Sequence, residues 1–65
     1  MNGKVKNANM EKGFGFILGN DNVEYFFHQS AILNGSMTDM ERGKQVTFEP
    51  GNGPKGPRAE DVRLA

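Results

Sequence analysis

The sequence predicts an all-β protein, a small closed or nearly closed barrel of five short strands. Short runs rich in β-branched and aromatic residues recur along the chain, and clusters of glycine, asparagine and proline separate them. No segment with helical character reaches the roughly 12 residues that a free-standing helix needs. Closing the sheet also removes exposed strand edges, which matter here because two of the runs are strongly apolar.

The three N-terminal runs are expected to form a meander with short connections. Residues 3–8 alternate polar with small or apolar side chains, and Val5 is their core candidate. The aromatic runs over residues 12–18 and 23–28 have the composition of strands. Between them, the Gly-Asn-Asp-Asn segment at residues 19–22 favours a hairpin, because these residues tolerate positive φ.

The second half of the chain is expected to contain two single helical turns and two strands. The turns cover residues 30–35 and 38–43, and each ends at a glycine. The fourth strand, residues 44–49, directs Val46 and Phe48 inward. Pro50 is expected to end this strand, because proline cannot donate to a β-ladder.

Residues 50–57, rich in proline and glycine, are predicted to form a loop, and residues 58–64 an edge strand with Val62 in the core. Lys55 and Arg58 give this loop a basic character, so it can act as an arm that contacts phosphates or base edges. A tolerant surface loop without a binding role is the alternative.

The composition fits one small domain, residues 1–65, with a core of marginal size. The chain has no cysteine, so neither a disulfide nor a thiolate metal site is expected. No apolar run approaches the roughly 20 residues that span a bilayer, and the N-terminus has no signal-peptide pattern. We therefore expect a cytoplasmic protein without membrane attachment. We also expect a monomer, and a strand-exchanged dimer stays open.

The two aromatic runs carry large apolar side chains on both faces, which is unusual in so small a barrel. Alternate side chains of a strand point to opposite faces, so Ile17, Tyr25 and Phe27 are expected in the core. If the runs pair as antiparallel neighbours, the other face presents one cluster of rings. Its members are Phe14, Phe16, Phe26 and His28.

Exposed rings of this kind are typical of a surface on which nucleic-acid bases stack, at roughly 1–3 kcal/mol per base. The alternative is that every ring belongs to the core, although the chain offers few other large apolar side chains to bury both faces. Net charge is zero, which argues against a strongly electropositive binder. The charges are unevenly distributed along the chain, however. Lys6 and Lys12 flank the rings and are candidates for phosphate contacts. The alternative is that these charges are scattered over the surface and are only solvated.

An enzymatic role is not expected. His28 is the single histidine of the sequence, and Ser30 follows two residues later. Nothing else in the chain resembles a nucleophile elbow or an oxyanion loop, and one histidine cannot build a typical zinc site. We therefore predict no catalytic residues, no metal, no cofactor and no small-molecule substrate.

These segments resemble the cold-shock domain family, the small bacterial cold-shock proteins. The matching residues follow the family's order and spacing over essentially the whole chain. They are Gly-Lys-Val-Lys at 3–6, Glu-Lys-Gly-Phe-Gly-Phe-Ile at 11–17, Phe-Phe-His at 26–28, Ser-Ala-Ile at 30–32, residues 43 and 46–49, and residues 56–62. Paired ribonucleoprotein-type motifs in this arrangement are a specific signal.

The resemblance implies a five-stranded antiparallel OB-fold barrel that binds single-stranded RNA or DNA with low sequence specificity. Such proteins act as RNA chaperones or antiterminators. The rings implied to stack on bases are Phe14, Phe16, Phe26 and His28, and the implied backbone contacts come from Lys6, Lys12 and Lys55.

The chain also departs from the family pattern, because Asn7-Ala8 replaces Trp-Phe, Gln29 replaces a phenylalanine after the histidine, and Met37 replaces a loop phenylalanine. We expect a weaker or shorter-footprint binder with more base selectivity, in which Asn7 and Gln29 hydrogen-bond to base edges and Met37 packs against a base. An alternative from another class is a protein-interaction OB barrel that docks a partner on the remaining rings.

Overall fold

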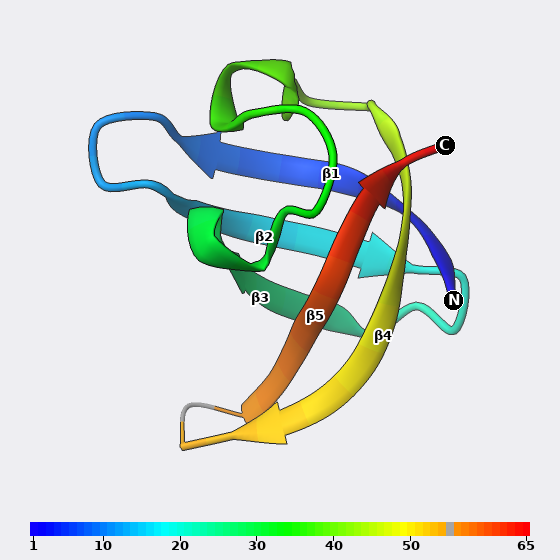
Figure 1. Cartoon of the computed structure of the whole chain (residues 1–65). Helices are drawn as coiled ribbons and strands as arrows, with labels where there is room; N and C mark the ends of the chain where they lie inside the picture. The colour runs from blue at the N-terminus through cyan, green and yellow to red at the C-terminus, as the bar shows by residue number, and fades with distance from the viewer. Residues whose placement is uncertain (55) are drawn as a thin grey trace.

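The computed structural model describes residues 1–54 and 56–65 and places them in one closed five-stranded barrel (Figure 1). Its elements are β1 (Asn2–Asn9), β2 (Phe14–Gly19), β3 (Glu24–His28), the 3-10 turns η1 (Gln29–Ala31) and η2 (Met37–Asp39), β4 (Gln45–Gly53) and β5 (Gly56–Leu64). Around the barrel the strands follow the order β1-β2-β3-β5-β4. The predicted fold class, a five-stranded all-β barrel of the OB type, is confirmed.

One part of that prediction is wrong, because the pairing is not purely antiparallel. β3 and β5 run parallel, with Phe26 opposite Arg58, whereas the other neighbouring pairs are antiparallel. Strand direction cannot alternate around a closed ring that has an odd number of members. Five strands therefore require at least one parallel pair, and here it closes the barrel between β3 and β5.

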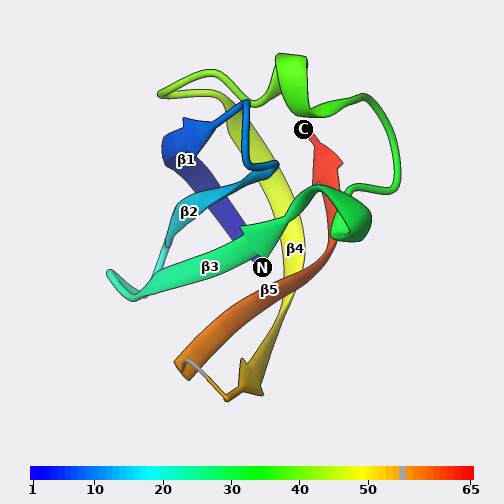
Figure 2. The ribbon, with the colours of Figure 1, turned by 90° about the vertical axis from the view of Figure 1, so that its left-hand side faces the viewer.

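β4 and β5 are longer than predicted. Pro50 does not end β4, because it pairs with Ala59 and the ladder continues to the end of the strand. Pairing of β4 with β1 stops at Thr47, so among the described residues the other edge of β4 has no strand partner at Pro50. Proline is tolerated at such an edge. In place of the predicted loop, residues 50–53 and 56–57 belong to the paired ends of β4 and β5, which extend beyond the rest of the barrel (Figure 2).

The two helical turns are present but shorter than predicted. η1 begins at Gln29, one residue before the predicted start, and ends at Ala31. Ile32 then forms a parallel bridge with Val62, which draws the chain back into an extended conformation. η2 is capped at its start, where Asp39 accepts a hydrogen bond from the Ser36 backbone N–H at 2.9 Å.

The barrel interior holds the predicted core residues and several that the sequence did not single out. Tyr25 packs on Phe48 with ring centroids 4.9 Å apart, and Phe27 is fully buried. Met37 and Met40 from the η2 segment close one side of the core. The buried apolar residues are Val5, Ile17, Tyr25, Phe27, Met37, Met40, Val46, Phe48, Ala59 and Val62.

Gly15 in β2 has no room for a side chain. A Cβ atom there would collide with the Asn7 carbonyl oxygen and would lie 2.8 Å from Ala8 Cα and 2.9 Å from Phe27 Cε1. We expect Gly15→Ala to lower the free energy of unfolding in urea by about 1–3 kcal/mol. Gly53→Ala is the control, since its Cβ would meet Arg58 Cδ at an ordinary 3.5 Å. Equal stability of the two variants would contradict this packing.

A hydrogen bond at the β2–β3 connection links stability to pH. The Tyr25 hydroxyl donates to Asp21 Oδ2 at 2.7 Å. This bond lowers the pKa of Asp21 from its ordinary value of 3.8 and raises the pKa of Tyr25 from its ordinary value of 10.0. The Asp21 carboxylate therefore stabilises the fold at any pH above the pKa that it has in the unfolded chain. This stability is lost as the pH falls through the lower pKa that Asp21 has in the folded protein. The Tyr25 hydroxyl stabilises the fold at any pH below the pKa that it has in the unfolded chain. This stability is lost as the pH rises through the higher pKa that Tyr25 has in the folded protein.

Tyr25→Phe tests this linkage. We expect the variant to be less stable than the parent by a constant amount between about pH 5 and pH 9. The difference should narrow below about pH 4, where protonation of Asp21 weakens the bond in the parent alone. Urea unfolding over a pH series measures this difference, and a gap that stays constant down to about pH 2 would count against the linkage.

Candidate nucleic-acid interface

Four rings gather on the outer face of β2 and β3, and we call them the ring surface. In the antiparallel register Phe14 lies opposite His28, and Phe16 lies opposite Phe26. The Phe26 ring is central, with its centroid 5.7 Å from that of Phe14 in a tilted arrangement and 6.0 Å from that of Phe16 in an edge-on one. The structure thus brings together the four rings that the sequence singled out, namely Phe14, Phe16, Phe26 and His28.

The ring surface is open to solvent, whereas the residues between its members are buried. All four side chains are partly exposed, and Gly15, Ile17, Tyr25 and Phe27 are buried. The alternation of strand side chains explains this division, since successive residues face outward and inward. The alternative in which every ring belongs to the core is therefore excluded. Leu18, with 40% of its surface exposed, extends the same face along β2.

Contacts with η1 orient the His28 ring. The Ser30 backbone N–H donates to His28 Nδ1 at 3.1 Å, and Ser30 Oγ lies 2.9 Å from the same nitrogen. Because a backbone N–H can only donate, Nδ1 is an acceptor and the neutral ring carries its hydrogen on Nε2. The hydrogen bond from Ser30 to His28 caps the start of the η1 turn, and this structural role explains why the two residues lie close together.

The predicted basic residues lie in different settings around the rings. Lys12 is exposed in the turn that leads into β2. Lys6 forms an ion pair with Glu24, with 2.7 Å between Nζ and Oε2 and each side chain 50% exposed. Arg58 lies beside Phe26 through the parallel β3–β5 pairing. Lys55 lies outside the described residues, so its assignment stays a prediction.

Gln29 and Met37 differ in their relation to the ring surface. Gln29 is exposed and directly follows His28, and its amide group packs against Gly13, where a Cβ would lie 2.7 Å from Gln29 Cδ. Met37 is only 8% exposed and belongs to the core, so it does not join the ring surface. The apolar thioether belongs to the buried cluster of the barrel, and the expectation that Met37 packs against a base stays a prediction.

A hollow beside Phe26 was not predicted from the sequence. It has a volume of about 230 Å³ and is lined by Phe26, Arg58 and residues of the β4–β5 hairpin. Arg58 Nε is buried and has no hydrogen-bond partner in the described part of the chain. The hollow depends on the parallel contact of β3 with β5, for which the sequence carries no local signal.

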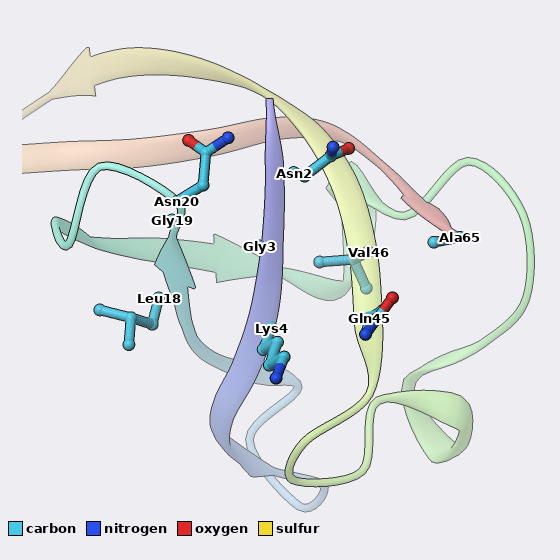
Figure 3. A pocket seen from close by; sticks show the side chains of 9 residues that line it. All are labelled: Asn2, Gly3, Lys4, Leu18, Gly19, Asn20, Gln45, Val46 and Ala65. Atoms are coloured by element: carbon cyan, nitrogen blue, oxygen red, sulfur yellow. The ribbon is translucent and has the colours of Figure 1, made fainter.

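A larger hollow of about 400 Å³ is lined by none of the four rings and lies across β1, β2 and β4 (Figure 3). Its lining includes Lys4, Leu18 and Gln45. The described residues contain no group of three or more histidine, cysteine or acidic side chains that could hold a metal ion. They also contain no helix that is long and apolar enough to cross a membrane.

The closed five-stranded barrel places the protein in the OB class, and the open ring surface is its candidate binding site. Comparison with known proteins specifies the family. Residues 1–65 match the family model described as the 'Cold-shock' DNA-binding domain. The chain belongs to the cold-shock domain family, whose members are nucleic-acid-binding proteins and not enzymes.

Curated relatives support this assignment over nearly their whole length. The chain is 42% identical over 62 residues to cold shock protein 2 of Lactiplantibacillus plantarum, covering 95% of this chain and 94% of the relative. It is 45% identical over 62 residues to the cold shock-like protein CspC of Bacillus cereus, covering 95% of each. It is 44% identical over 61 residues to cold shock protein CspD of Bacillus subtilis, covering 94% of this chain and 92% of the relative.

Proposed function

We propose that the ring surface binds single-stranded RNA or DNA by stacking bases on Phe14, Phe16, Phe26 and His28. The observation that carries this proposal is the grouping of four partly exposed rings on one face of two paired strands. Rings bind the faces of all bases, so stacking needs little sequence match. The protein then acts as an RNA chaperone or antiterminator that keeps transcripts unpaired.

Polar residues around the rings are suited to the rest of the strand. Lys12 and Arg58 flank the ring surface and supply cations for phosphates, and Lys6 is a third candidate at its β1 edge. The exposed amides of Asn7 and Gln29 offer hydrogen bonds to base edges. We also propose that the protein acts as a monomer in the cytoplasm, where transcripts are its partners.

The affinity should be lower than a fuller set of rings would give. Asn7, Ala8 and Gln29 occupy positions where the family has aromatic residues, and Met37 is buried. If each missing ring removes about 1 kcal/mol, the total loss amounts to a few powers of ten in affinity. Hydrogen bonds from the amides recover part of this loss for particular bases. Submicromolar, base-independent binding of heptamers would contradict this expectation.

A salt series distinguishes nucleic-acid binding from protein binding on the same rings. The affinity for a heptameric single strand should fall linearly on a log–log plot, with a slope of about −0.7 for each phosphate contact. Phosphate contacts of Lys12 and Arg58 thus predict a slope of about −1.4, to which Lys6 adds only where a phosphate displaces Glu24. Docking of a protein on the rings would depend little on salt. A chain that shows no affinity for the heptamer even at low salt would overturn the proposed function.

A further inference from the structure

Lys6 and Glu24 form an ion pair that spans a whole strand. Lys6 lies at the irregularity of β1 between Val5 and Asn7, and Glu24 is the first residue of β3. β1 and β3 are not neighbours, since β2 lies between them in the barrel. The 2.7 Å contact between Nζ and Oε2 therefore passes over the outer face of β2.

The register shows where the pair crosses. Asn7, next to Lys6, lies opposite Phe16, and Glu24 lies opposite Leu18. Phe16 and Leu18 are successive outward-facing residues of β2. The ion pair thus lies across the boundary between them, at the edge of the ring surface.

The position of Glu24 affects how a nucleic acid meets Lys6. A phosphate that approaches the ammonium has to displace a carboxylate that is already at hydrogen-bond distance. The carboxylate, once displaced, remains nearby and repels the phosphate. Both side chains are half exposed, so the pair is weak enough to be opened by a competing anion.

We propose that Glu24 sets the affinity and the selectivity of the ring surface by neutralising Lys6. This inference rests on the proposed function. Glu24 reduces the part of the binding free energy that comes from contacts with the phosphate backbone of the nucleic acid. The affinity then depends mainly on the stacked bases. A polyanion without bases that can stack, such as polyphosphate, gains little affinity from Lys6 while Lys6 is paired with Glu24. The zero net charge of the chain agrees with a surface that selects bases over charge.

Glu24→Gln tests the proposal, with a heptameric single strand and inorganic polyphosphate as probes. Freeing one lysine should steepen the log–log salt slope by about 0.7, which corresponds to about fivefold tighter heptamer binding at 0.1 M salt and no change near 1 M. Polyphosphate binding should increase as well. Glu49→Gln is the matched control, because it changes the net charge equally on β4, which pairs with neither β2 nor β3.

A double-mutant cycle shows whether the effect passes through Lys6. Lys6→Gln alone should weaken heptamer binding by less than about twofold, because Glu24 already neutralises Lys6. In the Lys6→Gln background, Glu24→Gln should lose most of its effect. An equal gain in both backgrounds would overturn the proposal in favour of a general field effect.

Three further outcomes are distinguishable. Weaker heptamer binding by Glu24→Gln would show that the carboxylate itself accepts hydrogen bonds from bases, which contradicts the proposed role. Unchanged binding, with a parent protein that binds the heptamer, would defeat this inference and leave the proposed function standing. Failure of the parent protein to bind at low salt would defeat both.

Discussion

Replacing Phe26 with alanine is expected to weaken binding of a heptameric single strand by about 10- to 100-fold. The Phe26 ring contacts both Phe14 and Phe16, so its removal takes away one stacking partner and the lateral support of two others. Fluorescence anisotropy of a labelled heptamer measures the loss. Because the side chain is only partly buried, the variant should still unfold cooperatively in urea.

Leu18→Ala is the matched control for Phe26→Ala. Leu18 faces outward on β2, 40% exposed, and truncation removes apolar surface without removing a ring. Its effect on heptamer binding should stay within about twofold, since an aliphatic side chain offers no π-face for stacking. A folded Phe26→Ala variant that binds as tightly as Leu18→Ala would contradict the role of the rings.

Alanine at the next residue, Phe27, should instead lower the stability of the fold. Phe27 is fully buried, and Phe27→Ala should lower the free energy of unfolding by about 3–5 kcal/mol. The stability of a domain of this size is itself only about 5 kcal/mol, so a large fraction of the variant should be unfolded. Urea unfolding followed by circular dichroism measures the change.

Phe27→Leu separates lost volume from lost aromatic character, because leucine refills most of the cavity. We expect a cost of about 1–2 kcal/mol and near-normal heptamer binding by the folded fraction. A folded and stable Phe27→Ala variant with impaired binding would reverse the assignment of the two faces of β3.

The division of β2 and β3 into two faces could be predicted because it depends only on strand geometry and local sequence. Phe26 and Phe27 are adjacent, and alternation alone assigns one to the surface and the other to the core. The core positions Val5, Ile17 and Val46 follow from the same alternation. These features need no knowledge of how distant strands meet.

Features that depend on the closure of the barrel could not be predicted in the same way. The parallel contact of Phe26 with Arg58 follows from the number of strands and their order, which local patterns do not reveal. Pro50 continues β4 because, among the described residues, no strand pairs with the other edge of β4 at this position. This is a property of the assembled sheet. Met37 has the apolar character of either a core or a contact residue, and the local sequence does not show that it is buried.

The Lys6–Glu24 ion pair shows the same limit for the candidate site. The two residues are 18 positions apart and lie on strands that do not pair with each other. Their contact requires the β1 irregularity and the register of two hairpins together. The sequence identified Lys6 as a phosphate candidate, but it gave no signal that a carboxylate already holds the ammonium.

The most direct test of base stacking is a titration of the isotope-labelled protein followed by amide chemical shifts, with a heptamer and with an abasic strand of equal length. We predict that amides of residues 14–16 and 26–28 shift together and saturably with the heptamer and respond weakly to the abasic strand. Equal responses to both strands, or shifts confined to the hollow around Gly3 and Gln45, would contradict a surface on which Phe14, Phe16, Phe26 and His28 hold nucleic-acid bases.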